Sequence, residues 1–224
     1  MTRAEARILI RKELGETTAA FWTDAELNTW MNLAGHDIAE KALCIKSKSF
    51  MTTAEGQKEY DMDSLFAGFI CPTKVYMYQD GMTWEEMDQK TLEEMNHEFP
   101  GWKSAANGTP YLYIFEQDRG KVMTLYVPPN ALNSGTDYVE VYYAKDFSDI
   151  TADTASLSSQ LDSVVLELAL TDWVIAMGFE TRGQTEKAND RWTKYYGKLQ
   201  NYKTNLLNRM DEDQDIIMRP YRSR

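Results

Sequence analysis

The pattern of apolar and polar positions begins as helical. In the first fifty residues, apolar side chains recur at helical spacing in two stretches. A capping box introduces each stretch, formed by Thr2 with Glu5 and by Thr23 with Glu26. In a capping box each side chain caps a free backbone N–H of the other residue, which favours a helix start at that point. The pattern predicts two helices, the second reaching about Lys46.

The pattern changes to strands in the middle of the chain. From residue 49 to residue 144, short runs rich in Tyr, Val, Thr and Phe alternate with turn residues such as Asp80-Gly81. The predicted hairpins join residues 50–53 to 59–60, residues 70–78 to 83–87 and residues 111–116 to 122–127. With residues 138–144 these strands are expected to form a small antiparallel sheet. A short capped helix is predicted from Thr91.

The end of the chain is helical again. Residues 164–179 are apolar nearly all round, which predicts a helix that is covered on most sides. After Gly183, apolar and aromatic positions recur at gaps of four and three residues. These positions are Ala188, Trp192, Tyr195, Leu199, Tyr202, Leu206 and Met210. They predict one long helix packed against its predecessor, and residues 211–224, where the periodicity ends, are expected to be loose in the isolated subunit.

Together the elements predict an α+β chain that is mainly helical. The N- and C-terminal helices are expected to form a helical bundle, with a small antiparallel β module inserted between them. The predicted organisation is residues 1–48 for the first helices of the bundle, 49–147 for the β-rich insertion, 148–210 for the last helices, and 211–224 for a flexible tail.

Composition narrows the class of protein. The net charge is −11 with acidic residues scattered along the chain, which argues against a nucleic-acid-binding surface because phosphate neutralisation needs clustered Lys and Arg. An acidic wall would let a DNA backbone slide past, but simple solubility explains the charge equally well. Cys44 and Cys71 fit two unpaired thiols in a reducing compartment. With neither a membrane-length apolar run nor a signal-peptide pattern, a soluble protein made in the cytosol is expected.

Candidate catalytic residues are few. His36 and His97 are the only histidines, and Glu93 with His97 forms a single helical pair that is weak evidence for a metal site. Glu85 and Glu86 are adjacent, so in a strand they would point to opposite faces and could not flank a bond together. Phosphate-binding loops, nucleophile elbows and zinc-protease motifs are missing from the sequence. The prediction is a non-enzyme with no catalytic residue, metal or cofactor.

The high number of tryptophan and tyrosine residues is the remaining unusual feature of the sequence. The chain contains 6 Trp and 13 Tyr, more than a small core normally needs. Core packing explains most of them. Trp84 and Trp102, which lie near predicted loops, are candidates for subunit contacts, because interfaces between proteins are enriched in Trp and Tyr.

The order of several short motifs resembles that of the tailed-phage head–tail adaptor (connector) family. The motifs are Phe21-Trp22-Thr23-Asp24-Ala25-Glu26-Leu27 with Trp30, Gly56-Gln57 with Tyr60, Gly108-Thr109-Pro110-Tyr111, Leu125-Tyr126-Val127-Pro128-Pro129 and Val141-Tyr142-Tyr143. They cover nearly the whole chain. One departure lies after Tyr60, where the family tends toward Leu-Pro-x-Asp-Phe and this chain has no proline.

The resemblance implies a structural virion protein of the phage neck, assembled in the host cytoplasm. It implies a ring of identical subunits, twelve in number, beneath the portal protein. The ring would extend the DNA channel, with DNA only as passing cargo, and would dock the next neck or tail protein away from any membrane. The candidate portal-docking residues in the tail are Ile216, Ile217, Met218, Arg219, Tyr221 and Arg222. Another neck or tail-assembly protein, or a small cytosolic enzyme, remains the alternative.

Overall fold

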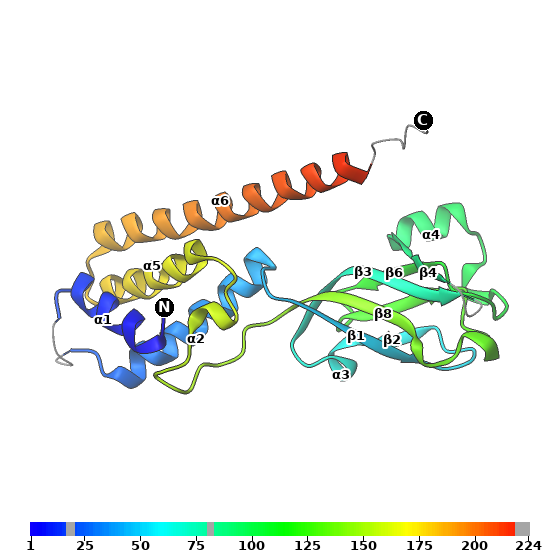
Figure 1. The fold of residues 1–224 in the computed structure, drawn as a ribbon, viewed down its shortest axis with the longest axis horizontal. Coiled ribbons are helices and arrows are strands. Elements are labelled where there is room, and N and C mark those ends of the chain that lie inside the picture. Colours follow the sequence, from blue (N-terminus) through cyan, green and yellow to red (C-terminus); the bar gives the residue numbers. More distant parts are fainter. Residues whose placement is uncertain (17–20, 80–82, 218–224) are drawn as a thin grey trace, which may run out of the picture. The chain divides into compact units, whose positions relative to one another are not determined.

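The chain forms two compact units. The computed structural model describes residues 1–16, 21–79 and 83–217, with the side chains of residues 79 and 207–217 left undescribed. The helical unit comprises Met1–Cys44 and Phe147–Arg224, and the β unit comprises Ile45–Asp146 (Figure 1). Within the described ranges, no helix has the length and apolar character needed to cross a membrane.

Long helices build the helical unit. They are α1 (Arg3–Glu13), α2 (Asp24–Ala42), α5 (Val164–Thr181) and α6 (Thr185–Ile217), with the short 3-10 helix η3 (Leu157–Ser159) before α5. Both predicted capping boxes are confirmed: the hydroxyls of Thr2 and Thr23 each accept a hydrogen bond of 3.2 Å from the backbone N–H three residues later.

The prediction that the second helix reaches about Lys46 is wrong. Helix α2 ends at Ala42, and the following Leu43 takes a left-handed backbone conformation with φ 50° and ψ 36°. Strand β1 (Lys46–Thr53) begins three residues later. A left-handed residue after the last turn ends many helices, but the residue is usually glycine, so Leu43 carries no such signal in the sequence.

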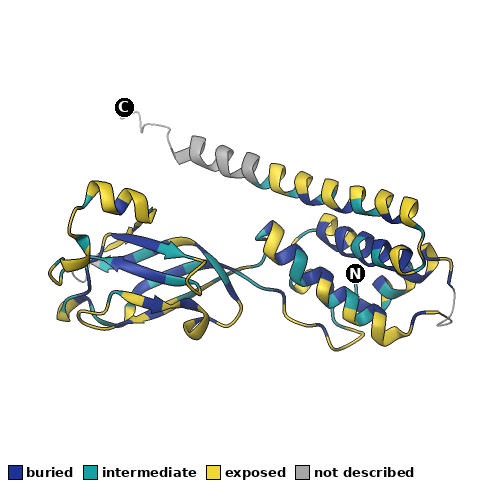
Figure 2. Ribbon diagram, turned by 180° about the vertical axis from the view of Figure 1, so that it is seen from behind, coloured by how far each residue is buried: buried dark blue, intermediate teal, exposed yellow. Residues whose placement is uncertain are grey.

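Helix α5 is the centre of the helical unit, as its apolar sequence predicts. It packs against α1, α2 and α6, and it is buried along most of its length (Figure 2). Two glycines in this unit allow a neighbouring side chain to lie close to the helix backbone. A Cβ atom added at Gly178 would lie 2.8 Å from Leu14 Cδ2, and one added at Gly35 of α2 would lie 2.5 Å from the Phe147 ring.

A buried carboxylate joins α5 to α6. Asp172 of α5 is only 3% exposed. It accepts a hydrogen bond of 3.0 Å from Arg191 and one from Lys198, both on α6. Arg191 also pairs with Glu13 of α1. The pairing supplies positive charge on both sides of a carboxylate that burial would otherwise destabilise.

A second ionic cluster ties α1 to the segment before η3. Arg3 and Arg7 donate to the Asp153 carboxylate at 2.7 Å and 2.9 Å. Hydrogen bonds from Arg7 and Arg3 lower the pKa of Asp153 to about 2. The ionised form of Asp153 is therefore the form that the folded chain favours.

This lowered pKa predicts an acid-dependent contribution to stability. Because the folded pKa of Asp153 lies below its ordinary value of 3.8, the contribution is present above about pH 4 and is lost as the pH falls toward 2. An Asp153→Asn variant is expected to unfold more readily than wild type at pH 7 and to match it near pH 2. Thermal unfolding followed by circular dichroism at several pH values measures this convergence, and a difference that is constant with pH would contradict it.

The β unit contains two sheets. The first has the strand order β1, β8 (Gly135–Lys145), β3 (Phe69–Gln79) and β4 (Thr83–Glu86), and the second has the order β2 (Glu59–Asp61), β7 (Val122–Tyr126), β6 (Leu112–Glu116) and β5 (Asp88–Lys90). The connections include the short helices α3 (Met62–Leu65), α4 (Leu92–Glu98), η1 (Trp102–Ser104) and η2 (Ala131–Asn133).

The two sheets share one apolar core. The first sheet contributes Met51, Val75, Met77, Val139, Val141 and Tyr143, and the second contributes Tyr60, Tyr113, Met123 and Leu125. Side chains alternate between the two faces of a strand, so each sheet has one face toward this core and one face away from it. On the second sheet, Leu112 and Ile114 point away from the shared core and pack against Met95 of α4.

Two of the three predicted hairpins are confirmed. Strand β3 pairs with β4, and β6 pairs with β7, both antiparallel. The prediction of a hairpin between residues 50–53 and 59–60 is wrong, because β1 pairs with β8 and β2 pairs with β7. The chain turns after β1 and enters the other sheet, so sequence neighbours are not strand neighbours there.

The expectation of a helical bundle with a small β module is also wrong. Besides its helices, the described part of the chain contains two four-stranded sheets, which make it an α+β fold. The physical reason is long-range pairing: β1 and β8 pair along their length, with Lys46 opposite Ala144. Strand β5 also pairs parallel with β6. Periodicity identifies individual strands but not such distant partners.

Candidate interaction surfaces

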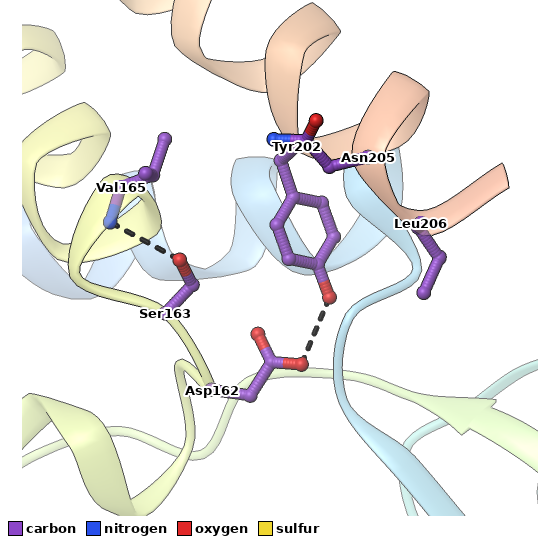
Figure 3. Close-up of a pocket in the computed structure, with 6 residues that line it drawn as sticks. All are labelled: Asp162, Ser163, Val165, Tyr202, Asn205 and Leu206. Atoms are coloured by element: carbon purple, nitrogen blue, oxygen red, sulfur yellow. Dashed lines mark hydrogen bonds between the residues drawn. The ribbon is translucent and has the colours of Figure 1, made fainter. Parts of the chain in front are cut away.

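Helix α6 extends beyond the start of α5. Near that start, Asp162, Ser163 and Val165 line a cavity of about 170 Å³ with Tyr202, Asn205 and Leu206 of α6 (Figure 3). The Tyr202 hydroxyl donates to Asp162 at 2.9 Å. Because α6 continues to Ile217, its residues 207–217 run past the start of α5 for about 16 Å at 1.5 Å per residue. We call residues 207–217 the overhang.

The described part of the predicted seam on α6 is confirmed. Ala188, Tyr195 and Leu199 are buried against α5. Met210, the last position of the predicted seam, lies among the residues whose side chains are not described. The sequence of the overhang mixes the apolar residues Met210, Ile216 and Ile217 with four acidic residues at positions 211, 212, 213 and 215, so the seam pattern does not continue through it.

The predicted docking tail falls partly within this helix. Ile216 and Ile217 lie in the last turn of α6, where only the backbone is described. Met218, Arg219, Tyr221 and Arg222 lie outside the described residues. Exposed apolar side chains also stand at the start of α5, where Val164 is 69% exposed and Leu168 is 38% exposed.

Trp84 belongs to an aromatic surface of the β unit. It lies on β4, on the face of the first sheet that points away from the shared core. We call this surface the aromatic face; it consists of Phe50, Tyr76, Tyr78, Trp84 and Tyr142. The ring centroids of Trp84 lie 5.1 Å from Tyr78 and 5.8 Å from Phe50. Phe50 is 46% exposed and Trp84 is 42% exposed.

Ion pairs lie among these rings. Lys48 pairs with Glu140 at 2.9 Å, and Lys74 pairs with Glu86 at 3.3 Å. These pairs are exposed, so each adds little to stability. Their effect is to leave the aromatic face close to neutral, on a strongly acidic chain.

Trp102 lines a groove in the other half of the β unit. Its indole N–H donates to Asn96 at 2.9 Å, and its ring packs beside Met95. A groove of about 360 Å³ lies next to it, which we call the α4 groove. Its lining residues are Lys58, Glu59, Leu92, Trp102, Lys103, Glu116, Arg119 and Thr124. The structure does not bring Trp84 and Trp102 together, because Trp84 lies on the outer face of the first sheet and Trp102 lies on the outer side of the second sheet.

Burial shifts the pKa of two tyrosines. Burial raises the pKa of Tyr113, between the sheets, to about 12. Burial, together with a hydrogen bond to Asp37, raises the pKa of Tyr195. His36 contacts Asp149 at 3.1 Å. Among the described residues, no three His, Cys, Asp or Glu side chains come together as metal ligands would.

These features define a class of protein: a two-unit chain whose distinctive surfaces are apolar and aromatic patches suited to protein contacts. A comparison with models of protein families identifies the family to which the chain belongs. The family model described as SU10 adaptor protein matches residues 1–224, and the chain belongs to this family of phage adaptor proteins. No curated protein matches the chain. The family confirms the resemblance to phage adaptors and indicates a structural phage protein.

Proposed function

We propose that this chain is a head–tail adaptor subunit. Twelve copies form a ring beneath the portal protein, extend the DNA channel and offer a platform for the next neck or tail protein. The match of the adaptor family to the whole chain supports this proposal. The net charge of −11 suits a channel wall that must release DNA.

In this proposal the portal is bound through the overhang and the residues that follow it. The sequence of this segment contains the neighbouring apolar residues Ile216, Ile217 and Met218, which the proposal assigns to burial against the portal. Beyond it, Arg219, Arg222 and Arg224 add positive charge. Trp84 and Trp102 are the proposed contacts between neighbouring subunits.

A truncation tests the portal contact. Deleting residues 211–224 is expected to abolish association with the portal protein of the same phage and to leave the chain folded, because the deleted residues lie beyond the start of α5. Light scattering of each protein alone and of the mixture measures the association. The matched control keeps a tail of the same length with residues 211–224 in scrambled order, and it is also expected to lose binding.

Two outcomes would contradict the proposal. Full-length protein that ignores the portal at every salt concentration would place the chain with other neck or tail-assembly proteins. Truncated protein that binds the portal as well as full-length protein would assign the docking to another surface.

A further inference from the structure

The aromatic face of the β unit mixes rings with charges. Two neighbouring rows of side chains run across the strands of the first sheet, and aromatic and charged residues alternate in both rows. In strand order the first row is Lys48, Tyr142 and Lys74, and the second row is Phe50, Glu140, Tyr76 and Glu86. Beyond the second row, Tyr78 and Trp84 lie opposite each other. We propose that this face binds a neutral oligosaccharide, a function that goes beyond the adaptor role and does not depend on it.

The rings of this face are available to a ligand. Phe50 is 46% exposed and Trp84 is 42% exposed. The centroid of the Trp84 ring lies 5.8 Å from that of Phe50 and 5.1 Å from that of Tyr78, so the three rings form one continuous strip. These spacings are close to the length of one pyranose ring in a sugar chain. The C–H groups of a sugar carry partial positive charge, and they pack on the negative face of an aromatic ring.

The ion pairs among the rings favour a sugar over a protein as the ligand. Lys48 pairs with Glu140, and Lys74 pairs with Glu86, whose carboxylate also accepts from the Tyr76 hydroxyl at 3.3 Å. A protein that covered the rings would take both pairs out of water, which is costly unless every lost hydrogen bond is replaced. The cores of protein interfaces are accordingly depleted of charged residues. The hydroxyl groups around a sugar ring accept from ammonium groups and donate to carboxylates, so a sugar covers the rings and keeps the charges hydrogen-bonded.

The balance of charge favours a neutral ligand over a nucleic acid. Single-stranded nucleic acids also stack their bases on aromatic rings, but the surface that binds them carries net positive charge along the backbone. Each lysine in the two rows is paired with a glutamate, so the charges of the rows cancel. Lys46 adds one positive charge on the same side of β1, in a chain whose net charge is −11. A ligand without charge therefore matches this face.

Sugar binding by the full-length chain tests the proposal. The probes are neutral hexasaccharides of glucose and of N-acetylglucosamine, measured by isothermal titration calorimetry, and the neutral polysaccharide purified from the surface of the host cell, measured by retardation in an affinity gel. At least one probe is expected to bind. Because the ligand is neutral, its affinity is expected to stay the same between about 0.05 M and 0.5 M salt.

Variants of Trp84 assign the binding to the aromatic face. Trp84→Ala is expected to weaken binding by about tenfold, because it removes a ring that the sugar covers. Trp84→Phe keeps a ring and is expected to bind within about threefold of wild type. The matched control is Leu132→Ser, which alters an exposed apolar residue of the same unit and is expected to have no effect. Circular dichroism shows whether each variant is folded.

Three results would overturn the proposal. They are the absence of binding to every sugar probe, binding that Trp84→Ala leaves unchanged, and tighter binding to single-stranded oligothymidine that falls steeply with salt. The last of these would assign the face to nucleic acid.

The subunit contact proposed for Trp84 uses the same face, so a sugar and a neighbouring subunit are expected to exclude each other. A hexasaccharide that binds the free chain and is released as rings form on the portal would support both assignments. A hexasaccharide that binds the free chain and the ring alike would support the sugar site and would move the subunit contact away from Trp84.

Discussion

Replacing Asp172 by alanine is expected to cost about 3–5 kcal/mol of unfolding free energy, the range for breaking a buried ion pair by removing one partner. Asp172 is 3% exposed and accepts hydrogen bonds from both Arg191 and Lys198. Its removal leaves Lys198 beside an apolar helix without its carboxylate. Chemical denaturation followed by circular dichroism measures the loss.

Two further variants separate the charge effect from other causes. Asp190→Ala removes an exposed carboxylate that pairs with Lys194 on the same helix, and it is expected to cost less than about 0.5 kcal/mol. Asp172→Ala combined with Lys198→Met is expected to recover part of the stability, since the unpaired charge is removed as well. Equal losses for Asp172→Ala and Asp190→Ala would refute the argument.

Replacing Gly35 by alanine is expected to destabilise the chain by about 1–3 kcal/mol, the usual cost of overpacking. Glycine inside a helix normally gives the opposite result, because alanine favours the helix by about 1 kcal/mol. At Gly35, however, the new Cβ would lie 2.5 Å from Phe147 Cδ1 and 2.6 Å from Phe147 Cγ. The ring must therefore move, and Phe147 is buried at 3% exposure.

Gly197 supplies the matched control. It lies in the middle of α6, and a Cβ atom there would meet no atom within 4 Å. Gly197→Ala is therefore expected to raise the thermal midpoint, while Gly35→Ala lowers it. A double-mutant cycle with Phe147→Leu assigns the Gly35 effect to the ring contact; additive effects would show that the contact is not the cause.

Local signals in the sequence predicted local structure correctly. The capping boxes at Thr2 and Thr23 depend on residues three positions apart, and both helices start where they indicate. The capping box at Thr91 likewise starts α4. The β3–β4 and β6–β7 hairpins depend on short turns, so they too could be predicted.

These local signals could not predict which distant segments pair with one another. The pairing of β1 with β8 joins residues at the two ends of the insertion, and nothing within either strand specifies the other. The partners of Asp172 were missed for a similar reason, although a carboxylate inside an apolar helical run is itself a signal of a buried ion pair. The aromatic face could not be predicted from Trp84 alone, since its rings come from four strands.

The pairing of Lys46 with Ala144 also has an evolutionary consequence. Residues facing each other across an antiparallel ladder lie about 5 Å apart, so the chain leaves the helical unit and returns to it through two neighbouring strands. Recombination at these two points would exchange residues 45–146 as a single cassette and would leave the contacts among α1, α2, α5 and α6 untouched. An exchange of this kind would change the surfaces of the β unit while the helical unit kept its own packing.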